Sequence, residues 1–474
     1  MPAKKIIPAI TFLFISLLSL AQPSSKFIGT WEGTLNVGIE LRIVFHIAED
    51  GKGGFITTAD SPDQSAYELK CDVTTITNAD LTIKMLELDA SFTGKLINDS
   101  TIEGLFTQRA AFPLVLKKTE KVLEKVRPQT PKPPFPYKSE EVIYFNADQS
   151  LQYGATITIP EGKGPFPAIV LITGSGPQDR DETILGHKLF AVIADHLTKK
   201  GFIVIRTDDR GVGKSTGKFI EATSEDFATD VSTSVDYLLS RPEVDKKKIG
   251  LVGHSEGGMI APMVAVKRKD INFIVLLAGP GVPIVELMAE QNAAIAKASG
   301  ATDEISEEIR PLFKNVVTAI MNAPDSAVAL AGASKIIENW AAGKNEEALK
   351  ELSFETVTKR TNYIAEMVKE FKTPWFRYFM KFDPGVYLEQ LTCKVLALNG
   401  EKDIQVISKQ NLPGIERSLK KSGSKVYEVK ELPGMNHLFQ TCTKCDLEEY
   451  GKLDETFSPS ALQTISDWLL KNIK

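Results

Sequence analysis

Several residue types and patterns that would mark particular protein classes are scarce or missing in this chain of 474 residues. Four cysteines are too few for a disulfide framework. Acidic residues outnumber basic ones by 61 to 56, for a net charge of −5, so no basic excess is available to hold a nucleic acid. A composition of 43% hydrophobic and 25% charged residues excludes a disordered or collagen-like chain. Because a single core stops growing at roughly 250–300 residues, we expect more than one domain.

The one long apolar run of the sequence lies near its start, at Ile6–Leu20. It follows Lys4 and Lys5 and precedes the small residue Ala21, which is the layout of a cleaved secretory signal peptide. A membrane anchor is the alternative, but a span needs about 20 apolar residues. The pattern therefore predicts a signal peptide at 1–21, export to the periplasm or the extracellular space, and no membrane anchor.

Residues 22–122 have the pattern of an all-β domain. Leu41–Ile47 and Leu81–Met85 are rich in β-branched and apolar residues, and Gly51–Gly54 and Asn98–Ser100 separate such runs as turns. Many short strands with frequent turns predict a small sandwich or barrel.

A proline-rich segment, 123–139, follows, with five prolines between Arg127 and Pro136, and it predicts an extended linker. From residue 140 to 474, strand-like runs alternate with helix-length stretches, which predicts an α/β fold with a mainly parallel, doubly wound sheet. The expected strands are Ala168–Ile172, Phe202–Arg206, Ile249–Val252, Phe273–Leu277 and Val395–Leu398. Residues 284–388 break this alternation and predict a helical cap, with helices at Glu286–Ser299, Glu304–Met321, Ala327–Ala342 and Glu346–Lys369.

A candidate nucleophile stands between an expected strand and an expected helix. Gly253-His254-Ser255-Glu256-Gly257 has the G-x-S-x-G spacing of a nucleophile elbow. The tight turn lifts the hydroxyl of Ser255 above the sheet, and Gly253 and Gly257 allow the backbone to approach its neighbours. The helix that follows directs the positive end of its dipole at the site.

A serine nucleophile needs a base, and the sequence has only five histidines. His46 falls in the β domain, His254 adjoins the serine, and His187 and His196 fall in a helical stretch where packing or surface roles are more common. His437, in a loop near the end of the chain, is the predicted base. The carboxylate that orients it is expected after the strand Val395–Leu398, where Asp403 is preferred and Glu401 is the fallback. The order serine, acid, histidine along the chain is that of an α/β-hydrolase triad.

The glycine-rich turn Thr173–Pro177 follows another expected strand and can offer unpaired backbone N–H groups. We expect the N–H groups of Ser175 and Glu256 to form the oxyanion hole. Two other motifs are set aside. Gly211–Ser215 lacks the first glycine of a phosphate-binding loop. Cys442-Thr443-Lys444-Cys445 has no second cysteine pair for zinc, and a local disulfide or free thiols both remain open.

These motifs resemble those of exported bacterial α/β-hydrolases of the EstD-like carboxylesterase group, over about residues 140–474. The segments that carry the resemblance are Ile172–Asp181, Asp208–Ser215, Gly253–Gly258, Leu398–Asp403 and Gly434–His437. One departure is Thr173, where relatives often have histidine. The resemblance implies ester hydrolysis through an acyl-enzyme under a helical cap, and some such proteins also have a small N-terminal β domain.

The sequence therefore predicts a serine carboxylesterase that acts on small or short-chain esters and requires no metal or organic cofactor. Two alternatives stay open: a serine aminopeptidase of the same superfamily, and a glycan- or lipid-binding protein with a vestigial hydrolase. The aromatic residues between Phe371 and Phe382 fit either the core of the cap or the lining of an acyl or alcohol pocket.

Overall fold

The computed structural model describes residues 26–64, 66–86, 88–108, 110–120 and 127–474. The expected signal peptide and the first residues of the expected linker lie outside these ranges. The chain forms two compact units, of which the larger contains Leu123–Lys474.

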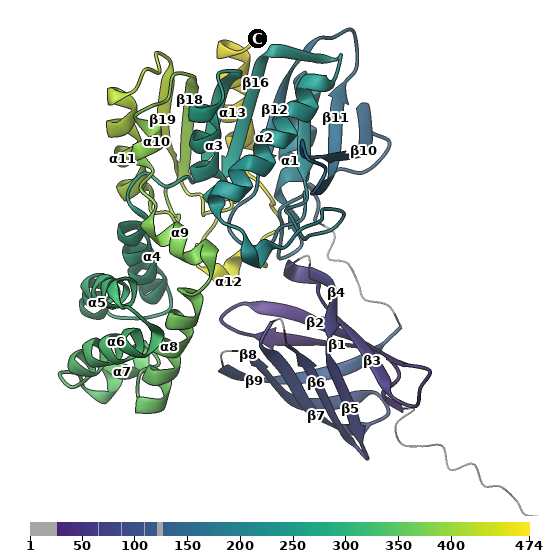
Figure 1. The fold of residues 1–474 in the computed structure, drawn as a ribbon, viewed down its shortest axis with the longest axis vertical. Helices are drawn as coiled ribbons and strands as arrows, with labels where there is room; N and C mark the ends of the chain where they lie inside the picture. The colour runs from purple at the N-terminus through teal and green to yellow at the C-terminus, as the bar shows by residue number, and fades with distance from the viewer. Residues whose placement is uncertain (1–25, 65, 87, 109, 121–126) are drawn as a thin grey trace, which may run out of the picture. The chain divides into compact units, whose positions relative to one another are not determined.

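The N-terminal β sheet has nine strands in the order β4-β3-β2-β1-β9-β8-β7-β6-β5 (Figure 1). It is one continuous sheet that curls into a nearly closed barrel, and a hydrogen bond of 2.8 Å between Thr74 Oγ1 and Thr57 Oγ1 joins β5 to β3. Alternate residues point inward, so that Trp31, Phe45 and Phe92 are fully buried. The strands are β1 (Gly29–Asn36), β2 (Glu40–Glu49), β3 (Phe55–Ser61), β4 (Ala66–Cys71), β5 (Val73–Thr77), β6 (Asp80–Met85), β7 (Ala90–Asn98), β8 (Thr101–Gln108) and β9 (Ala110–Thr119), with a 3-10 turn at Pro62–Gln64.

The larger unit contains an eight-stranded sheet in the order β10-β11-β15-β12-β16-β17-β18-β19. β11 runs antiparallel to β10 and β15, and the strands from β15 to β19 are parallel, so the sheet is mainly parallel as the sequence predicts. The strands are β10 (Tyr137–Phe145), β11 (Gln152–Pro160), β12 (Phe166–Ile172), β15 (Ile203–Thr207), β16 (Val244–His254), β17 (Ile271–Leu277), β18 (Lys394–Gly400) and β19 (Tyr427–Leu432). A small hairpin, β13 (Thr183–Ile184) and β14 (His187–Lys188), lies outside it.

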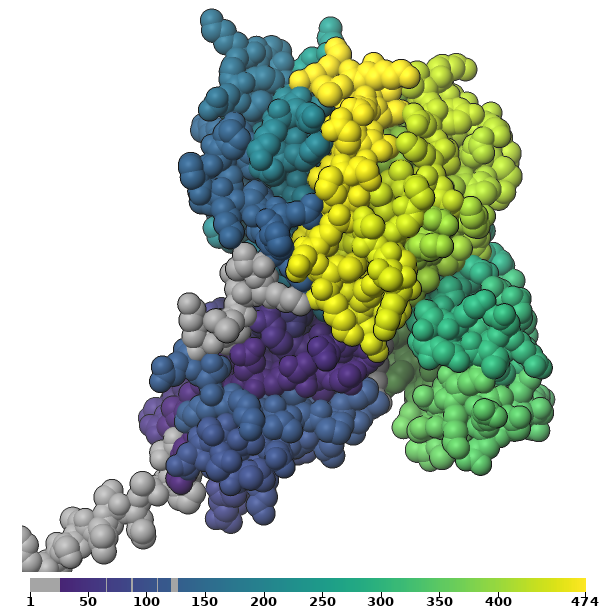
Figure 2. All heavy atoms as spheres, turned by 180° about the vertical axis from the view of Figure 1, so that it is seen from behind, coloured from purple at the N-terminus to yellow at the C-terminus, as the bar shows by residue number. Residues whose placement is uncertain are grey.

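Helices cover both faces of this sheet, which is why its inner strands are apolar throughout (Figure 1). α1 packs against α13, and α2 against α3. Figure 2 shows the opposite side of the molecule, where the C-terminal segment with α13 forms part of the surface of this unit. The helices are α1 (Leu189–Lys199), α2 (Ser224–Ser240), α3 (Glu256–Lys267), α11 (Ser408–Lys421), α12 (Leu447–Tyr450) and α13 (Pro459–Asn472), with a 3-10 turn, η3, at Phe219–Glu221.

In the sequence, a block of helices connects β17 to β18, and Figure 1 shows these helices beside the sheet. It comprises α4 (Ile284–Ala298), α5 (Asp303–Asn322), α6 (Ser326–Ala341), α7 (Glu346–Glu351), α8 (Val357–Glu370), α9 (Pro374–Lys381) and α10 (Gly385–Leu388). The single helix expected at Glu346–Lys369 is wrong, because α7 ends where Ser353 adopts a left-handed φ of 55°. Thr356 then caps α8 by accepting the N–H of Lys359.

The described part of the proline-rich segment is fixed to the α/β unit. The guanidinium of Arg127, which is 2% exposed, donates to the carbonyl oxygens of Leu185, Gly451 and Leu453 at 2.7–2.8 Å. This anchor makes the segment less free than a simple spacer. Over the ranges that the structure describes, no helix has both the length and the apolar character that crossing a membrane demands.

Candidate active site

Ser255 occupies a strained turn between β16 and α3. Its φ of 53° and ψ of −115° lie in a region that residues other than glycine rarely adopt. The backbone holds this conformation, because the N–H of Ser255 donates to Leu277 at 2.8 Å and its carbonyl accepts from Gly258 at 2.9 Å. The side chain is partly exposed, and within the described part of the chain its hydroxyl has no hydrogen-bond partner. A free hydroxyl is therefore presented at the end of the sheet.

Glycines allow the backbone contacts that close this turn. A Cβ atom on Gly253 would lie 2.0 Å from the carbonyl oxygen of Gly257, and one on Gly257 would lie 2.2 Å from that of Ile172. Gly258 has the same constraint, since its Cβ would meet Gly279 Cα at 2.7 Å. The G-x-S-x-G spacing thus corresponds to close backbone approaches at both of its glycines.

The structure brings His437 and Asp403 together. His437 Nδ1 lies 2.8 Å from Asp403 Oδ2, and both residues are buried. The other carboxylate oxygen, Oδ1, accepts the N–H groups of Gln405 at 2.8 Å and Val406 at 2.9 Å. Backbone donors therefore fix one oxygen of Asp403 and direct the other at the imidazole.

Glu401, the fallback for this position, lies elsewhere. Its carboxylate accepts the N–H of Gly434 at 3.0 Å and pairs with Lys402 at 3.2 Å. The backbone N–H of Gly434 and the Lys402 ammonium hold the pKa of Glu401 below the usual value.

The turn after β12 lies directly beside Ser255, because a Cβ on Gly174 would be 3.3 Å from the Cβ of Ser255. Asp209 fixes the turn by accepting from Thr173 Oγ1 at 2.8 Å and from the N–H of Gln178 at 2.9 Å. Burial raises the pKa of Asp209 well above its usual value.

Two backbone donors near this turn stay open. In the described ranges the N–H of Ser175 has no acceptor, whereas that of Gly174 donates to Glu182 at 2.7 Å. The N–H of Glu256 opens α3 and therefore lacks an intrahelical acceptor. These are the two donors that the sequence analysis singled out.

The side chain of Glu256 has contacts that sequence reasoning missed. Its Oε1 accepts the hydroxyl of Ser224 at 2.5 Å and the indole N–H of Trp375 at 2.9 Å. Burial raises its pKa, although both hydrogen bonds oppose that shift. Trp375 belongs to α9 and stacks on Phe379 at 5.1 Å. The aromatic cluster thus both packs within the helical block, through Phe371, Phe379 and Phe382, and contacts the residue after Ser255.

His254 directs its ring away from Ser255 into a buried network. Nδ1 lies 2.9 Å from Glu182 Oε1, and Nε2 lies 3.0 Å from the carbonyl oxygen of His437. The rings of His254 and His437 are 4.9 Å apart. Glu182 carried no signal in the sequence that would reveal this role.

The remaining three histidines belong to other elements of the structure. His187, expected in a helix, is instead fully buried in β14, where it contacts Thr456 and Tyr450. His196 lies on α1, and His46 lies in the N-terminal sheet beside Thr30.

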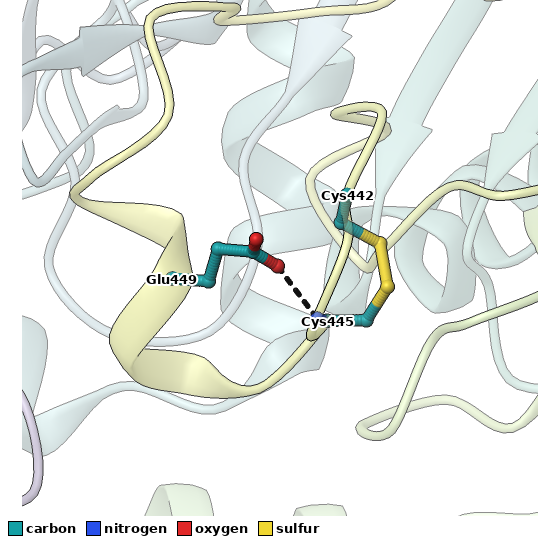
Figure 3. Close-up of side chains that lie close together, drawn as sticks. All are labelled: Cys442, Cys445 and Glu449. Atoms are coloured by element: carbon teal, nitrogen blue, oxygen red, sulfur yellow. Dashed lines mark hydrogen bonds between the residues drawn. A yellow bond between two sulfur atoms is a disulfide. The ribbon is translucent and has the colours of Figure 1, made fainter.

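One group of residues in the described part of the chain is close enough to hold a metal: Cys442, Cys445 and Glu449. Figure 3 shows that the two sulfurs form a disulfide and that Glu449 points at the N–H of Cys445, 2.6 Å away. The same carboxylate accepts the N–H groups of Thr443 and Lys444. The possible metal-binding atoms are thus already engaged, the sulfurs in the disulfide and the carboxylate in hydrogen bonds to backbone N–H groups. Of the two alternatives that the sequence leaves open for Cys442 and Cys445, the structure has the disulfide.

The order of the strands and the placement of these groups define an α/β-hydrolase fold. Numbered along the chain, the eight strands stand in the order 1-2-4-3-5-6-7-8. Ser255 follows the fifth strand, Asp403 the seventh and His437 the eighth. The carboxyl ends of parallel strands meet at one edge of the sheet, which brings these loops together.

Comparisons with known proteins agree with a hydrolase. Residues 187–373 match the family model of serine aminopeptidase, S33. A stretch of 158 residues is 35% identical to Esterase EstD of Thermotoga maritima and covers 33% of this chain and 37% of that protein. Another of 172 residues is 26% identical to acyl-coenzyme A thioesterase 5 of Mus musculus, covering 36% of this chain and 37% of that one. The chain thus spans little more than a third of the length of these relatives.

Among solved structures, the α/β hydrolase GrgF from Penicillium sp. sh18 covers 71% of this chain with 99% of its own, at 14% identity and a TM-score of 0.42. The Pyrococcus furiosus esterase PF2001 also covers 71% of this chain, with 92% of its own, at the same identity and TM-score.

Proposed function

We propose that this chain is a serine carboxylic-ester hydrolase that forms an acyl-enzyme with small or short-chain esters. The observation that carries the proposal is the hydrogen bond between His437 and Asp403, whose other carboxylate oxygen is held by backbone N–H groups. The backbone of His437 also contacts His254, the residue before Ser255. The similarity to Esterase EstD supports ester bonds as the substrate class.

In the proposed reaction, Ser255 Oγ attacks the ester carbonyl carbon while His437 Nε2 accepts the hydroxyl proton. Asp403 holds the Nδ1–H tautomer and stabilises the imidazolium. The N–H groups of Ser175 and Glu256 bind the oxyanion. The bond to the alcohol oxygen then breaks, and His437 donates its proton to the departing alcohol. Water then attacks the acyl carbon while His437 accepts its proton; the bond to Ser255 Oγ breaks, and His437 returns the proton to Ser255 as the acid leaves. These steps use no metal or organic cofactor.

Covalent labelling with a fluorophosphonate probe tests this proposal. The full chain should incorporate one probe at Ser255, and Ser255→Ala should abolish the labelling. Ser240→Ala, at the exposed end of α2, is the matched control and should be labelled normally. Absence of labelling in the folded parent protein would refute a serine hydrolase.

A serine aminopeptidase is the second candidate, because residues 187–373 match that family model. The two functions share the nucleophile and differ in the bond that is cleaved. Turnover of a short-chain aryl ester should exceed turnover of an aminoacyl anilide under the same conditions. The opposite ranking would favour the peptidase.

We further propose that residues 1–21 direct export. The disulfide between Cys442 and Cys445 supports an oxidising compartment. Mass spectrometry of the protein expressed in a bacterium should find a mature N-terminus at Gln22 in the periplasm or the medium. An uncut chain in the cytoplasm would contradict export.

A further inference from the structure

The ring of His254 faces two hydrogen-bond acceptors, whereas a neutral imidazole donates only one hydrogen bond. Nε2 lies 3.0 Å from the carbonyl oxygen of His437, and a carbonyl oxygen only accepts, so Nε2 carries a proton. Nδ1 lies 2.9 Å from Oε1 of Glu182. His254 is only 2% exposed, so solvent water does not replace either contact.

The second proton belongs either to the ring or to the carboxyl group of Glu182, which is 1% exposed. Glu182 Oε1 also accepts the N–H of Gly174 at 2.7 Å, and a hydroxyl at Oε1 would accept that bond poorly. A hydroxyl at Oε2 would be buried with no acceptor in the part of the chain that the structure describes. When the ring holds the proton, Oε1 accepts two N–H bonds, one from Gly174 and one from the imidazolium, and Oε2 remains without a partner in the described part of the chain but carries no hydroxyl that needs an acceptor.

We propose that His254 is a protonated positioning residue. Its imidazolium forms a buried ion pair with Glu182 and connects the turn after β12, Thr173–Pro177, to the loop that contains His437. Glu182 holds the turn through Gly174, and His254 holds the loop through the carbonyl oxygen of His437. The significance of this link for catalysis rests on the proposed esterase function, but the protonation state itself does not.

The charged groups around the pair favour this state. Burial lowers the pKa of His254, but the carboxylates of Glu182 and Asp403 outweigh it, so that its pKa lies above the usual value. Among the residues that the structure describes, Asp209 and the ring of His437 also face the pair. Since the ring of His254 is 4.9 Å from that of His437, its charge opposes a second positive charge there.

Nitrogen-15 NMR of the full chain, labelled at its five histidines, tests the protonation state without any substrate. Both ring nitrogens of His254 should carry protons at neutral pH. They should keep these protons at pH values at which an ordinary histidine has already lost one. The signal is assigned by its loss in His254→Gln, or in the charge-free pair Glu182→Gln/His254→Gln if the single variant does not fold. One bare and one protonated nitrogen at neutral pH would overturn the proposal, whether or not the protein hydrolyses esters.

The pH profile of kcat/KM for an aryl ester tests the effect on the base. His254→Gln removes a positive charge beside the base and leaves the negative charge of Glu182 unpaired, so the electrostatic cost of adding a proton to the active site falls. The acid limb should move to higher pH by on the order of one unit, and Glu182→Gln/His254→Gln should reverse most of that shift. His196→Gln on α1 is the control and should match the parent profile. A loss of rate at every pH with no movement of the acid limb would overturn the proposed charge effect.

Discussion

Gly257 offers a sharp test of how tightly the elbow must close. In Gly257→Ala, the new Cβ would lie 2.2 Å from the carbonyl oxygen of Ile172 and 2.8 Å from that of Thr173. Ordinary contact begins at 3.4 Å, so the first distance is short by 3.4 − 2.2 = 1.2 Å. Both obstacles are backbone atoms, which no side-chain rotation can move. Either α3 or the turn after β12 must shift.

The size of that shift determines the expected losses of reaction rate and of folding stability. A displacement of about 1 Å in groups that position a reaction can cost about 10²-fold in rate. Overpacking of a buried site typically costs about 1–3 kcal/mol of stability. We therefore expect Gly257→Ala to lower kcat/KM about 100-fold and the free energy of unfolding by about 1–3 kcal/mol.

Initial rates with an aryl ester and denaturant unfolding of the same samples measure both effects. Gly332→Ala in α6 is the matched control, because its Cβ would meet Ala319 Cβ at an ordinary 3.7 Å. That substitution should keep full activity and stabilise the helix by about 0.5–1 kcal/mol. Parent-like activity and stability in Gly257→Ala would refute the argument from backbone contact.

Further predictions concern three carboxyl groups and one indole. Asp403→Asn should lower kcat about 10⁴-fold, whereas Glu401→Gln should change it little; equal losses in steady-state assays would count against Asp403 as the orienting group. Because burial raises the pKa of Glu256, the folded state binds its proton more tightly than the unfolded state does, and stability falls as pH rises above the usual 4.5. Glu256→Gln should therefore raise the unfolding midpoint at neutral pH, with a gain that shrinks below 4.5, and a gain independent of pH would contradict this cause. Trp375→Phe removes a donor to that buried carboxyl and should cost about 1–3 kcal/mol in denaturant unfolding; an unchanged midpoint would mean that the bond contributes nothing.

The residues of the site that lie in recognisable local sequence patterns could be predicted from the sequence. A serine with glycines two residues away on each side, between a strand and a helix, indicates an elbow. Asp403 and His437 could be placed because each follows a strand of the expected parallel sheet, and such strands end at one edge. The structure brings these two side chains together at 2.8 Å.

Contacts between segments that are distant in the sequence could not be predicted from any local pattern. Glu182 and His254 are 72 positions apart, and Glu256 and Trp375 are 119 apart. No periodicity relates residues that meet only through packing of separate elements. The break between α7 and α8 was also missed, because it depends on the left-handed backbone of Ser353, a residue type without a strong preference for that conformation.

The chain leaves the sheet at Leu277, the end of β17, forms the helices α4 to α10, and re-enters the sheet at Lys394 in the neighbouring parallel strand β18. The turn after β12, Ser255, Asp403 and His437 all lie outside this stretch of chain. A change in the helical block therefore leaves the proposed catalytic groups in place, as long as the hydrogen bond from Trp375 to Glu256 is kept. The two strand ends that bound the helical block are therefore the points at which a block from another protein could be exchanged without altering the sheet or the loops that hold these groups.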